Sequence, residues 1–413
     1  MQTDFQINGR DYRIPPRPAV VICLDGCEPA YLDAALAAGR MPALEKMLAG
    51  GGMRQLARSA MPSFTNPNNL SIACGVPSSV HGICGNFFLN PETGVAEMMN
   101  GAEYLRAPTV FAGFQQAGAR VAVVTAKDKL RALLGAGLDC AAGRAICFSA
   151  ERAGQATQAA NGLADAARWL GLPVPPVYSG ELSLFVLQAG VKLLAEGRAD
   201  ILYLSTSDYI QHKHAPGSDA ANAFMTGVDA ALAGLLAQDI ALVLTADHGM
   251  KPKHRADGSP NVIYLAPLLD AALGAGQARV ILPITDPYVA HHGALGSFAT
   301  VYLAAGADAA LAQACLAEVP GIDTVLPRAE ACASFDLPAD RLGDLVVTCS
   351  ADWALGTRAQ EHDLSGLDAP LRSHGGLDEQ QVPFVTNFVP TAPAPAEGLR
   401  NYDAWQVVSM FSA

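Results

Sequence analysis

The sequence predicts an α/β protein in which a mostly parallel sheet lies between helices, with a small α+β cap domain inserted. Two patterns predict this class. Short apolar runs alternate with helical patterns up to about residue 265, and shorter strands follow from residue 266. The residues are 51% hydrophobic and only 16% charged, a composition that excludes a disordered chain. With 413 residues, the chain is long enough to form more than one hydrophobic core.

The predicted strands of the main sheet are apolar runs without alternation, as expected for strands buried on both faces. They cover residues 19–24, 120–125, 201–205 and 240–245. Three helices between them are predicted by their end signals or composition. Residues 41–49 stop before Gly50, residues 108–117 begin with proline and stop before Gly118, and residues 219–238 are rich in alanine.

The second predicted unit contains a helix at residues 308–318 and four short strands, at residues 280–284, 299–303, 324–326 and 345–349. The chain then returns to a strand of the first unit at residues 382–388. We therefore expect a discontinuous core of residues 1–265 and 367–413, interrupted by a cap domain of residues 266–366. The cap carries no clear chemical motif except His291-His292, whose contribution to a site stays open.

Charge and composition restrict the partners. The net charge is −12, with 27 Lys and Arg against 39 Asp and Glu, which argues against a nucleic-acid partner. The long uncharged stretch of residues 59–91 is broken by Pro62, Pro67 and Pro77 and contains several asparagines, so it predicts no membrane span. Residues 1–13 lack an apolar signal segment, and the nine cysteines form no CxxC pair, which together predict a cytoplasmic protein with free thiols. The oligomeric state stays open, a homodimer included.

Polar side chains follow each predicted strand of the main sheet. They are Asp25 after the first strand, Lys127 and Lys129 after the second, Asp208 and His212 after the third, and Asp247 and His248 after the fourth. Ligands of open α/β sheets bind beyond the carboxyl ends of the strands. A single aspartate there is usually a helix cap or a turn residue. Because several strands of one sheet are each followed by such residues, we predict a functional site at their carboxyl ends.

The types and spacing of these residues predict a metal centre. Asp208 and His212 are four residues apart, so on a helix they share one face. Gly249 allows the turn that brings Asp247 and His248 together, and His374 adds a further imidazole in a glycine-rich loop. Carboxylate and imidazole ligands suit Zn²⁺, with Mn²⁺ or Fe as alternative occupants, and six ligands are enough for two ions.

Thr65 is the candidate nucleophile. We expect it in a loop before a helix N-terminus, where the helix dipole and free N–H groups favour an anion. A threonine at such a position is often only a cap. Beside a pair of metal ions, its hydroxyl can be activated for attack.

Taken together, these motifs resemble the alkaline phosphatase superfamily, and their order resembles its nucleotide pyrophosphatase/phosphodiesterase-like branch. The resemblance runs from residue 20 to about residue 390 and implies an alkaline phosphatase-like core with two zinc ions. It implies that Asp208, His212 and His374 bind one zinc. It also implies that a second zinc is bound by Asp25, Asp247, His248 and Thr65, and that Asn86 helps Thr65 to hold a phosphoryl oxygen.

A narrower resemblance is to the phosphonoacetate hydrolase family. It rests on the segments 62–69, 81–86, 125–129 and 212–214. It implies hydrolysis of the C–P bond of a small anionic phosphonate, giving acetate and phosphate. Lys127, Lys129 and His214 match the residues that bind the substrate carboxylate in that family. Without the other motifs, the lysine pair would be read as a solvated charged turn.

The chemistry of such a substrate agrees with these residues. Cleavage of the C–P bond expels a carbanion, so the transition state needs cations at both ends of the substrate. We expect Thr65 to attack phosphorus and form a phosphothreonine, which water then hydrolyses. The alternatives are a phosphodiesterase or phosphomonoesterase of the same superfamily and, more remotely, a non-catalytic metal-binding protein.

Overall fold

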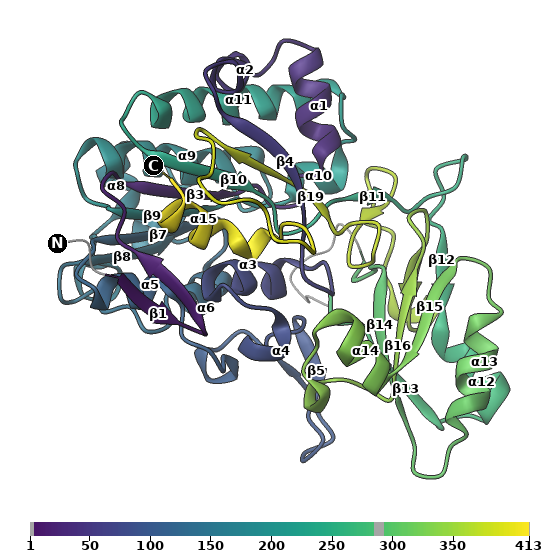
Figure 1. Ribbon diagram of the computed structural model, residues 1–413. Helices are drawn as coiled ribbons and strands as arrows, with labels where there is room; N and C mark the ends of the chain where they lie inside the picture. Colours follow the sequence, from purple (N-terminus) through teal and green to yellow (C-terminus); the bar gives the residue numbers. More distant parts are fainter. Residues whose placement is uncertain (1–3, 285–292, 413) are drawn as a thin grey trace.

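The computed structural model describes residues 4–284 and 293–412 (Figure 1). A seven-stranded sheet forms its centre. Six of the strands run in one direction, and β19 runs antiparallel to both of its neighbours. The order across the sheet is β4 (Met53–Arg58), β19 (Gln381–Thr386), β10 (Ala241–Thr245), β3 (Ala19–Cys23), β9 (Ile201–Ser205), β7 (Val121–Thr125) and β8 (Ala145–Ser149). The mostly parallel sheet expected from the apolar runs is confirmed.

The register of the sheet brings the predicted strand ends to one edge. Cys23 pairs with Thr245 on one side and with Ser205 on the other, and Ser205 also pairs with Thr125. The last residues of β3, β10, β9 and β7 therefore stand in one row. The polar residues that follow each strand begin at the same edge, as the topology of parallel strands requires.

Helices cover both faces of this sheet (Figure 1). One layer contains α1 (Pro29–Ala37), α2 (Pro42–Ala49), α9 (Gly180–Ala195) and α11 (Asp219–Leu236), and the other contains α3 (Thr65–Cys74), α5 (Val110–Gln116), α6 (Asp128–Leu134) and α15 (Ala404–Met410). The helix expected to begin at Pro108 begins two residues later. The Thr109 side chain accepts a hydrogen bond from the N–H of Ala112 and so makes Thr109 the cap.

Smaller elements complete the first unit. They are the hairpin β1 (Asp4–Ile7) and β2 (Arg10–Arg13), the pair β5 (Phe87–Leu89) and β6 (Ala96–Met98), and the short helices α4 (Ser78–His81), α7 (Gln158–Asn161), α8 (Ala166–Leu170) and α10 (Tyr209–Lys213). The hairpin packs against α5 and α15, next to the layer that contains α3.

A second, four-stranded sheet lies beside the first unit (Figure 1). Its order is β13 (Ala278–Ile281), β14 (Phe298–Leu303), β16 (Leu345–Cys349) and β15 (Ile322–Pro327), and every neighbouring pair is antiparallel. The helices α12 (Leu265–Leu273), α13 (Ala309–Ala317) and α14 (Arg328–Phe335) pack with it. The predicted small α+β unit is therefore present, and its strands start and end within three residues of the expected positions.

Two short strand pairs stand where the chain leaves the first unit and returns to it. β12 (Val262–Tyr264) pairs with β17 (Ala354–Gly356), and β11 (Lys251–Pro252) pairs with β18 (Arg372–Ser373). Beside them, the fully buried Nζ of Lys253 lies 2.8 Å from Oε1 of Glu379 and 2.6 Å from the carbonyl oxygen of Ala351. These contacts join the segment after β11 to the loops that follow β16 and β18.

All nine cysteines are free thiols, as the sequence predicts. Among the helices of residues 4–284 and 293–412, none combines the length and the apolar character needed to cross a bilayer.

Candidate active site

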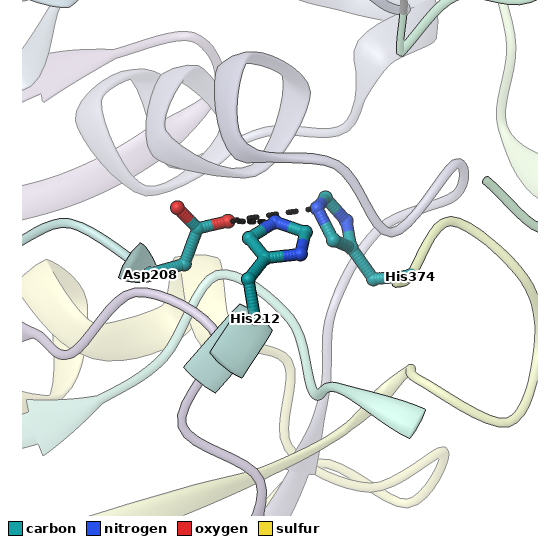
Figure 2. Close-up of side chains that lie close together, drawn as sticks. All are labelled: Asp208, His212 and His374. Atoms are coloured by element: carbon teal, nitrogen blue, oxygen red, sulfur yellow. Dashed lines mark ion pairs between the residues drawn. The ribbon is translucent and has the colours of Figure 1, made fainter. Parts of the chain in front are cut away.

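The first group of candidate ligands consists of Asp208, His212 and His374 (Figure 2). Asp208 occupies the N-cap position of α10 without a capping hydrogen bond, and His212 lies one turn later on the same face, so Oδ2 of Asp208 is 3.0 Å from Nε2 of His212. His374 follows β18 and places its Nε2 3.6 Å from the same carboxylate oxygen. The spacing of four residues therefore brings two ligands together, and the β11–β18 pair supplies the third.

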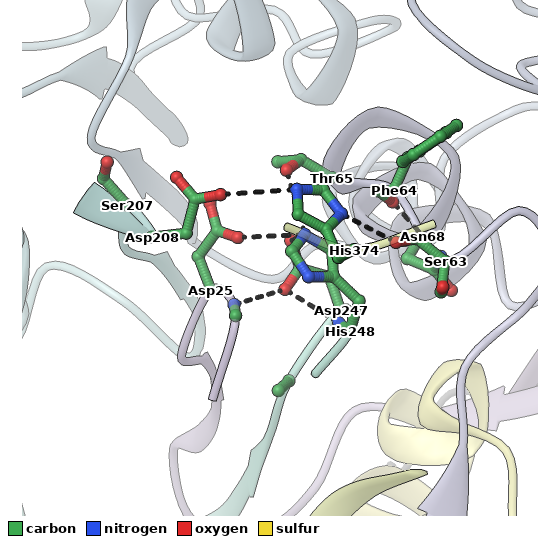
Figure 3. Close-up of polar contacts among 12 residues, drawn as sticks. Asp25, Ser63, Phe64, Thr65, Asn68, Ser207, Asp208, Asp247, His248 and His374 are labelled. Carbon is green, nitrogen blue, oxygen red and sulfur yellow. Dashed lines mark hydrogen bonds and ion pairs between the residues drawn. The ribbon is translucent and has the colours of Figure 1, made fainter. Parts of the chain in front are cut away.

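The second group consists of Asp25, Asp247 and His248 (Figure 3). Nε2 of His248 lies 3.3 Å from Oδ1 of Asp25 and 3.8 Å from Oδ2 of Asp247. In each of the two groups, the candidate ligand atoms all lie within 4.8 Å of one another and all three side chains are buried. The groups adjoin, because the rings of His248 and His374 stack with their centres 3.6 Å apart.

All three imidazole rings are oriented by backbone carbonyl groups. Nδ1 of His212 lies 2.8 Å from the carbonyl oxygen of Arg372, that of His248 lies 2.8 Å from Gly249, and that of His374 lies 2.9 Å from Ser63. A carbonyl oxygen only accepts, so each Nδ1 carries the proton. The lone pair of each Nε2 then faces the carboxylates, which is the orientation of metal-ligating histidines.

This arrangement fits bound cations. Imidazole lone pairs and carboxylate oxygens are all acceptors, so they repel one another unless a positive ion lies between them. Burial raises the pKa of Asp25 well above its usual value, and the neighbouring Asp208 and Asp247 act in the same direction. Among the described residues, Oδ1 of Asp25 has no hydrogen-bond donor. Imidazole nitrogens and carboxylate oxygens in this number are suitable ligands for Zn²⁺ or a similar ion in each group.

The charges within the site differ from one carboxylate to the next. Burial raises the pKa of Asp247, whereas at Asp208 the positive charge of Lys127 opposes the effect of burial. Burial lowers the pKa of His374 well below its usual value, aided by the two neighbouring histidines, so this ring is neutral at pH 7. A neutral imidazole is the form that binds metal.

Thr65 is the first residue of α3, rather than part of the loop before it. The helix begins earlier than expected because Asn66, Asn68 and Asn69 are buried within it, where their amides find hydrogen-bond partners. Oγ1 of Thr65 lies 3.2 Å from Nε2 of His248. The hydroxyl therefore stands at the N-terminus of a ten-residue helix and beside the second ligand group, a position that favours an anion.

A cavity connects the first ligand group, and Asp25 of the second, with most of the other predicted residues; Asp247 and His248 are not in its described lining. Its lining includes Thr65, Asn86, Lys127 and Lys129, together with Asp25, Asp208, His212 and His374. Lys127 precedes α6, and Asn86 is held by the bond from its N–H to the carbonyl oxygen of Pro283, at 2.7 Å. His214, at the end of α10, is not among the described residues of this lining. His291 and His292 lie outside the described residues.

Sequence reasoning missed other polar residues at the cavity. Asn66, Thr125 and Thr206 line it as well. One signal was available, because asparagines are rare in buried apolar segments and three of them stand in α3. The site also depends on Ser63, whose carbonyl group orients His374 and whose hydroxyl donates to the carbonyl oxygen of Gly376.

Two adjoining groups of buried carboxylates and imidazoles on an α/β fold are typical of metallo-hydrolases. The chain belongs to the type I phosphodiesterase/nucleotide pyrophosphatase family, whose model matches residues 19–377. The fold agrees, because murine ectonucleotide pyrophosphatase/phosphodiesterase 5 superposes with a TM-score of 0.63. That comparison covers 96% of this chain and 97% of the murine chain at 16% identity.

A narrower likeness extends over the whole chain. Phosphonoacetate hydrolase from Sinorhizobium meliloti 1021, solved in complex with phosphonoacetate and with phosphonoformate, is 57% identical with a TM-score of 0.96, and all of both chains is covered. A phosphonoacetate hydrolase from Penicillium oxalicum is 69% identical over 35 residues, which are 8% of this chain and 49% of that protein. Both resemblances inferred from the sequence are confirmed, and the chain is an enzyme of the hydrolase class.

Proposed function

We propose that this protein hydrolyses the C–P bond of phosphonoacetate, giving acetate and phosphate. The observation that supports this best is the cavity in which Lys127 and Lys129 stand beside Thr65, the first ligand group and Asp25 of the second. A phosphomonoester or diester needs no cationic pair away from the phosphoryl group. A substrate with a second anionic end does. The relatives that match over the full chain point to the same substrate.

The proposed metal assignment follows the two ligand groups. Asp208, His212 and His374 hold one Zn²⁺, and Asp25, Asp247 and His248 hold the other together with the hydroxyl oxygen of Thr65. Mn²⁺ or Fe are the alternative occupants. When bound, the ions neutralise phosphoryl charge and make a hydroxyl group or water more acidic.

Thr65 is the proposed nucleophile. Its Oγ1 forms a bond to phosphorus while the C–P bond breaks, and the electron pair of that bond moves onto the methylene carbon and into the carboxylate. The methylene carbon takes a proton from water to give acetate, and the threonine proton passes to solvent. A second water then cleaves the phosphothreonine and releases phosphate. The net reaction consumes one water molecule.

The remaining residues act on the two ends of the substrate. The ammonium groups of Lys127 and Lys129 bind the carboxylate and stabilise the negative charge that develops beside it. The side-chain amide of Asn86 donates a hydrogen bond to a phosphoryl oxygen. His214 is proposed as a third contact of the carboxylate. It follows α10 directly, and the Tyr31 hydroxyl donates to its carbonyl oxygen, which holds this turn.

The test is phosphate release from a matched panel. Phosphonoacetate, methylphosphonate and an aryl phosphodiester are compared at equal enzyme and zinc concentrations, and acetate is measured in the first reaction. We expect phosphonoacetate to be cleaved with the highest kcat/KM and methylphosphonate not to react, because its leaving group cannot delocalise a carbanion. A preference for the aryl phosphodiester would favour the phosphodiesterase activity of the wider family instead.

We propose that residues 266–366 form a cap that shields this site, on a core of residues 1–265 and 367–413. The guanidinium group of Arg341 donates to the carbonyl oxygens of Gly82, at 2.6 Å, and Tyr104, at 2.8 Å. These bonds hold the segment that carries Asn86. Arg341→Met should therefore speed amide exchange in residues 82–104 and raise KM for phosphonoacetate, while β3 stays protected. Unchanged exchange and KM would remove the support for this role.

A further inference from the structure

Asn69 lies on α3, one turn after Thr65, and connects the main sheet with Thr65 and with Asp247 of the second ligand group. Its side chain is fully buried. Oδ1 accepts hydrogen bonds from the hydroxyl groups of Tyr203 and Ser205, each at 2.8 Å. Nδ2 donates to Oδ2 of Asp247, at 2.9 Å, and to the carbonyl oxygen of Thr65, at 3.1 Å. All four bonds that an asparagine side chain commonly makes are formed.

The chemistry of the partners determines the orientation of this amide. Asp247 and the Thr65 carbonyl can only accept, so both must face Nδ2. The hydroxyl groups of Tyr203 and Ser205 then donate to Oδ1. Both belong to β9, which pairs with the central strand β3, and both are buried. The amide is thus held from the rigid sheet on one side and directed toward the site on the other.

The neighbouring asparagine differs in its contacts. Asn68 is equally buried, but its Nδ2 donates only to backbone carbonyl groups, those of Ala60, Pro62 and Phe64. Its Oδ1 accepts from the Ala60 N–H and from Asn401. These bonds fix the path of the chain before α3. Asn69 instead contacts a side chain of the second ligand group, so the two adjacent amides have different roles.

We propose that Asn69 is a positioning residue that sets the orientation of the Asp247 carboxylate and the first turn of α3 that carries Thr65. This inference rests on the proposed function, in which Asp247 binds a metal ion and Thr65 attacks phosphorus. Groups that orient a metal ligand typically change metal affinity or activity by about 10- to 100-fold when they are removed.

The test is a chelator titration of the zinc-loaded enzyme, with zinc counted per chain, alongside steady-state kinetics. Asn69→Asp keeps the size of the side chain but replaces both N–H donors by an acceptor that faces Asp247. We expect one zinc to be lost at roughly 10- to 100-fold lower chelator concentration, and the other to stay as in wild type. kcat should fall by a similar factor while KM changes less than about threefold, because no contact to the substrate is removed.

Two further variants make the result decisive. Asn161→Asp is the matched control, since Asn161 is a buried amide whose partners, Cys147 and Thr157, lie outside the site. It should retain both zinc ions as wild type does. Tyr203→Phe removes one of the two donors to Oδ1 and keeps the ring, so we expect a smaller loss of zinc affinity, below about tenfold.

The outcomes separate this role from the proposed function. Wild-type zinc retention in Asn69→Asp, or an equal loss in Asn161→Asp, would overturn the positioning role. If Asn69→Asp does not fold, wild-type zinc retention and kcat in Tyr203→Phe would assign the network to folding alone. If the wild-type enzyme fails to cleave phosphonoacetate, the proposed function is lost, yet the zinc titration still decides the role of Asn69.

Discussion

Oγ1 of Thr65 lies 3.2 Å from Nε2 of His248, although 183 residues separate them in the chain. The contact joins the N-terminus of α3 to the loop after β10. It places a hydroxyl group beside a buried cluster of carboxylates and imidazoles. The segment of Thr65 contains no carboxylate or imidazole near the hydroxyl. The contact therefore exists only because the start of α3 and the loop after β10 meet at one edge of the sheet.

Replacement of the hydroxyl tests the proposed covalent step. Thr65→Ala should fold and keep the zinc proposed for Asp208, His212 and His374, because the hydroxyl lies beside His248 of the other group. Its kcat should drop by several orders of magnitude, as expected for loss of a nucleophile. Thr65→Ser, the matched control, should retain part of the activity. Activity of Thr65→Ala within about tenfold of wild type would mean that water attacks phosphorus directly.

The two ligand groups predict two zinc ions per chain. Elemental analysis of the purified protein should find both, and a chelator should abolish activity that added Zn²⁺ restores. His374→Ala should lose one ion and keep the other, because it removes a ligand from one group only. Full activity with a single ion per chain would contradict the two-ion assignment.

The lysine pair predicts a substrate-dependent loss. Lys127→Ala or Lys129→Ala should lower kcat/KM for phosphonoacetate by roughly 10- to 150-fold, the range for a charge-assisted hydrogen bond of about 1.5–3 kcal/mol, or by more if the bond strengthens in the transition state. Hydrolysis of an aryl phosphate, which lacks a carboxylate, should suffer far less. Both substrates are measured on the same variant. Equal losses would assign the lysines to the phosphoryl group or to the fold.

His81 predicts a contribution to acid unfolding. The Ile83 N–H donates to Nδ1 of His81 at 3.1 Å, so the ring is neutral with its proton on Nε2, which faces the Ser71 hydroxyl at 2.9 Å. Burial lowers the pKa of His81 to about 3, and Arg341 acts in the same direction. The unfolded chain binds this proton near pH 6.5 and the folded chain does not. Stability is therefore complete above pH 6.5 and falls as the pH drops toward 3.

The measurement is denaturant unfolding across this pH range at constant excess zinc. His81→Gln keeps one donor and one acceptor but does not titrate. Wild type should lose about 1.4 kcal/mol more per pH unit than this variant between these two limits. Other titrating groups act on both proteins and cancel in the difference. Parallel curves for the two proteins would show that His81 takes up its proton without unfolding.

Much of the site was predictable because its chemistry is local in the sequence. Asp208 and His212 share a helix face through their spacing, and Asp247 is adjacent to His248. Buried strands are recognisable in the sequence as apolar runs, and the side chains that follow such strands lie at one edge of a parallel sheet. The start of α3 was not predictable, because two of its buried asparagines, Asn68 and Asn69, have partners from distant segments, Asn401 and Asp247.

The sequence by itself determined the α/β class, the approximate strands and helices, and the residue types able to hold two metal ions. Only the tertiary structure decided how these residues are held. The carbonyl groups that orient His212 and His374, the buried pair of Lys253 with Glu379, and the bonds of Asn69 all join distant segments. Hydrogen bonds depend on distance and angle between specific atoms, and a one-dimensional pattern carries neither until the chain is packed.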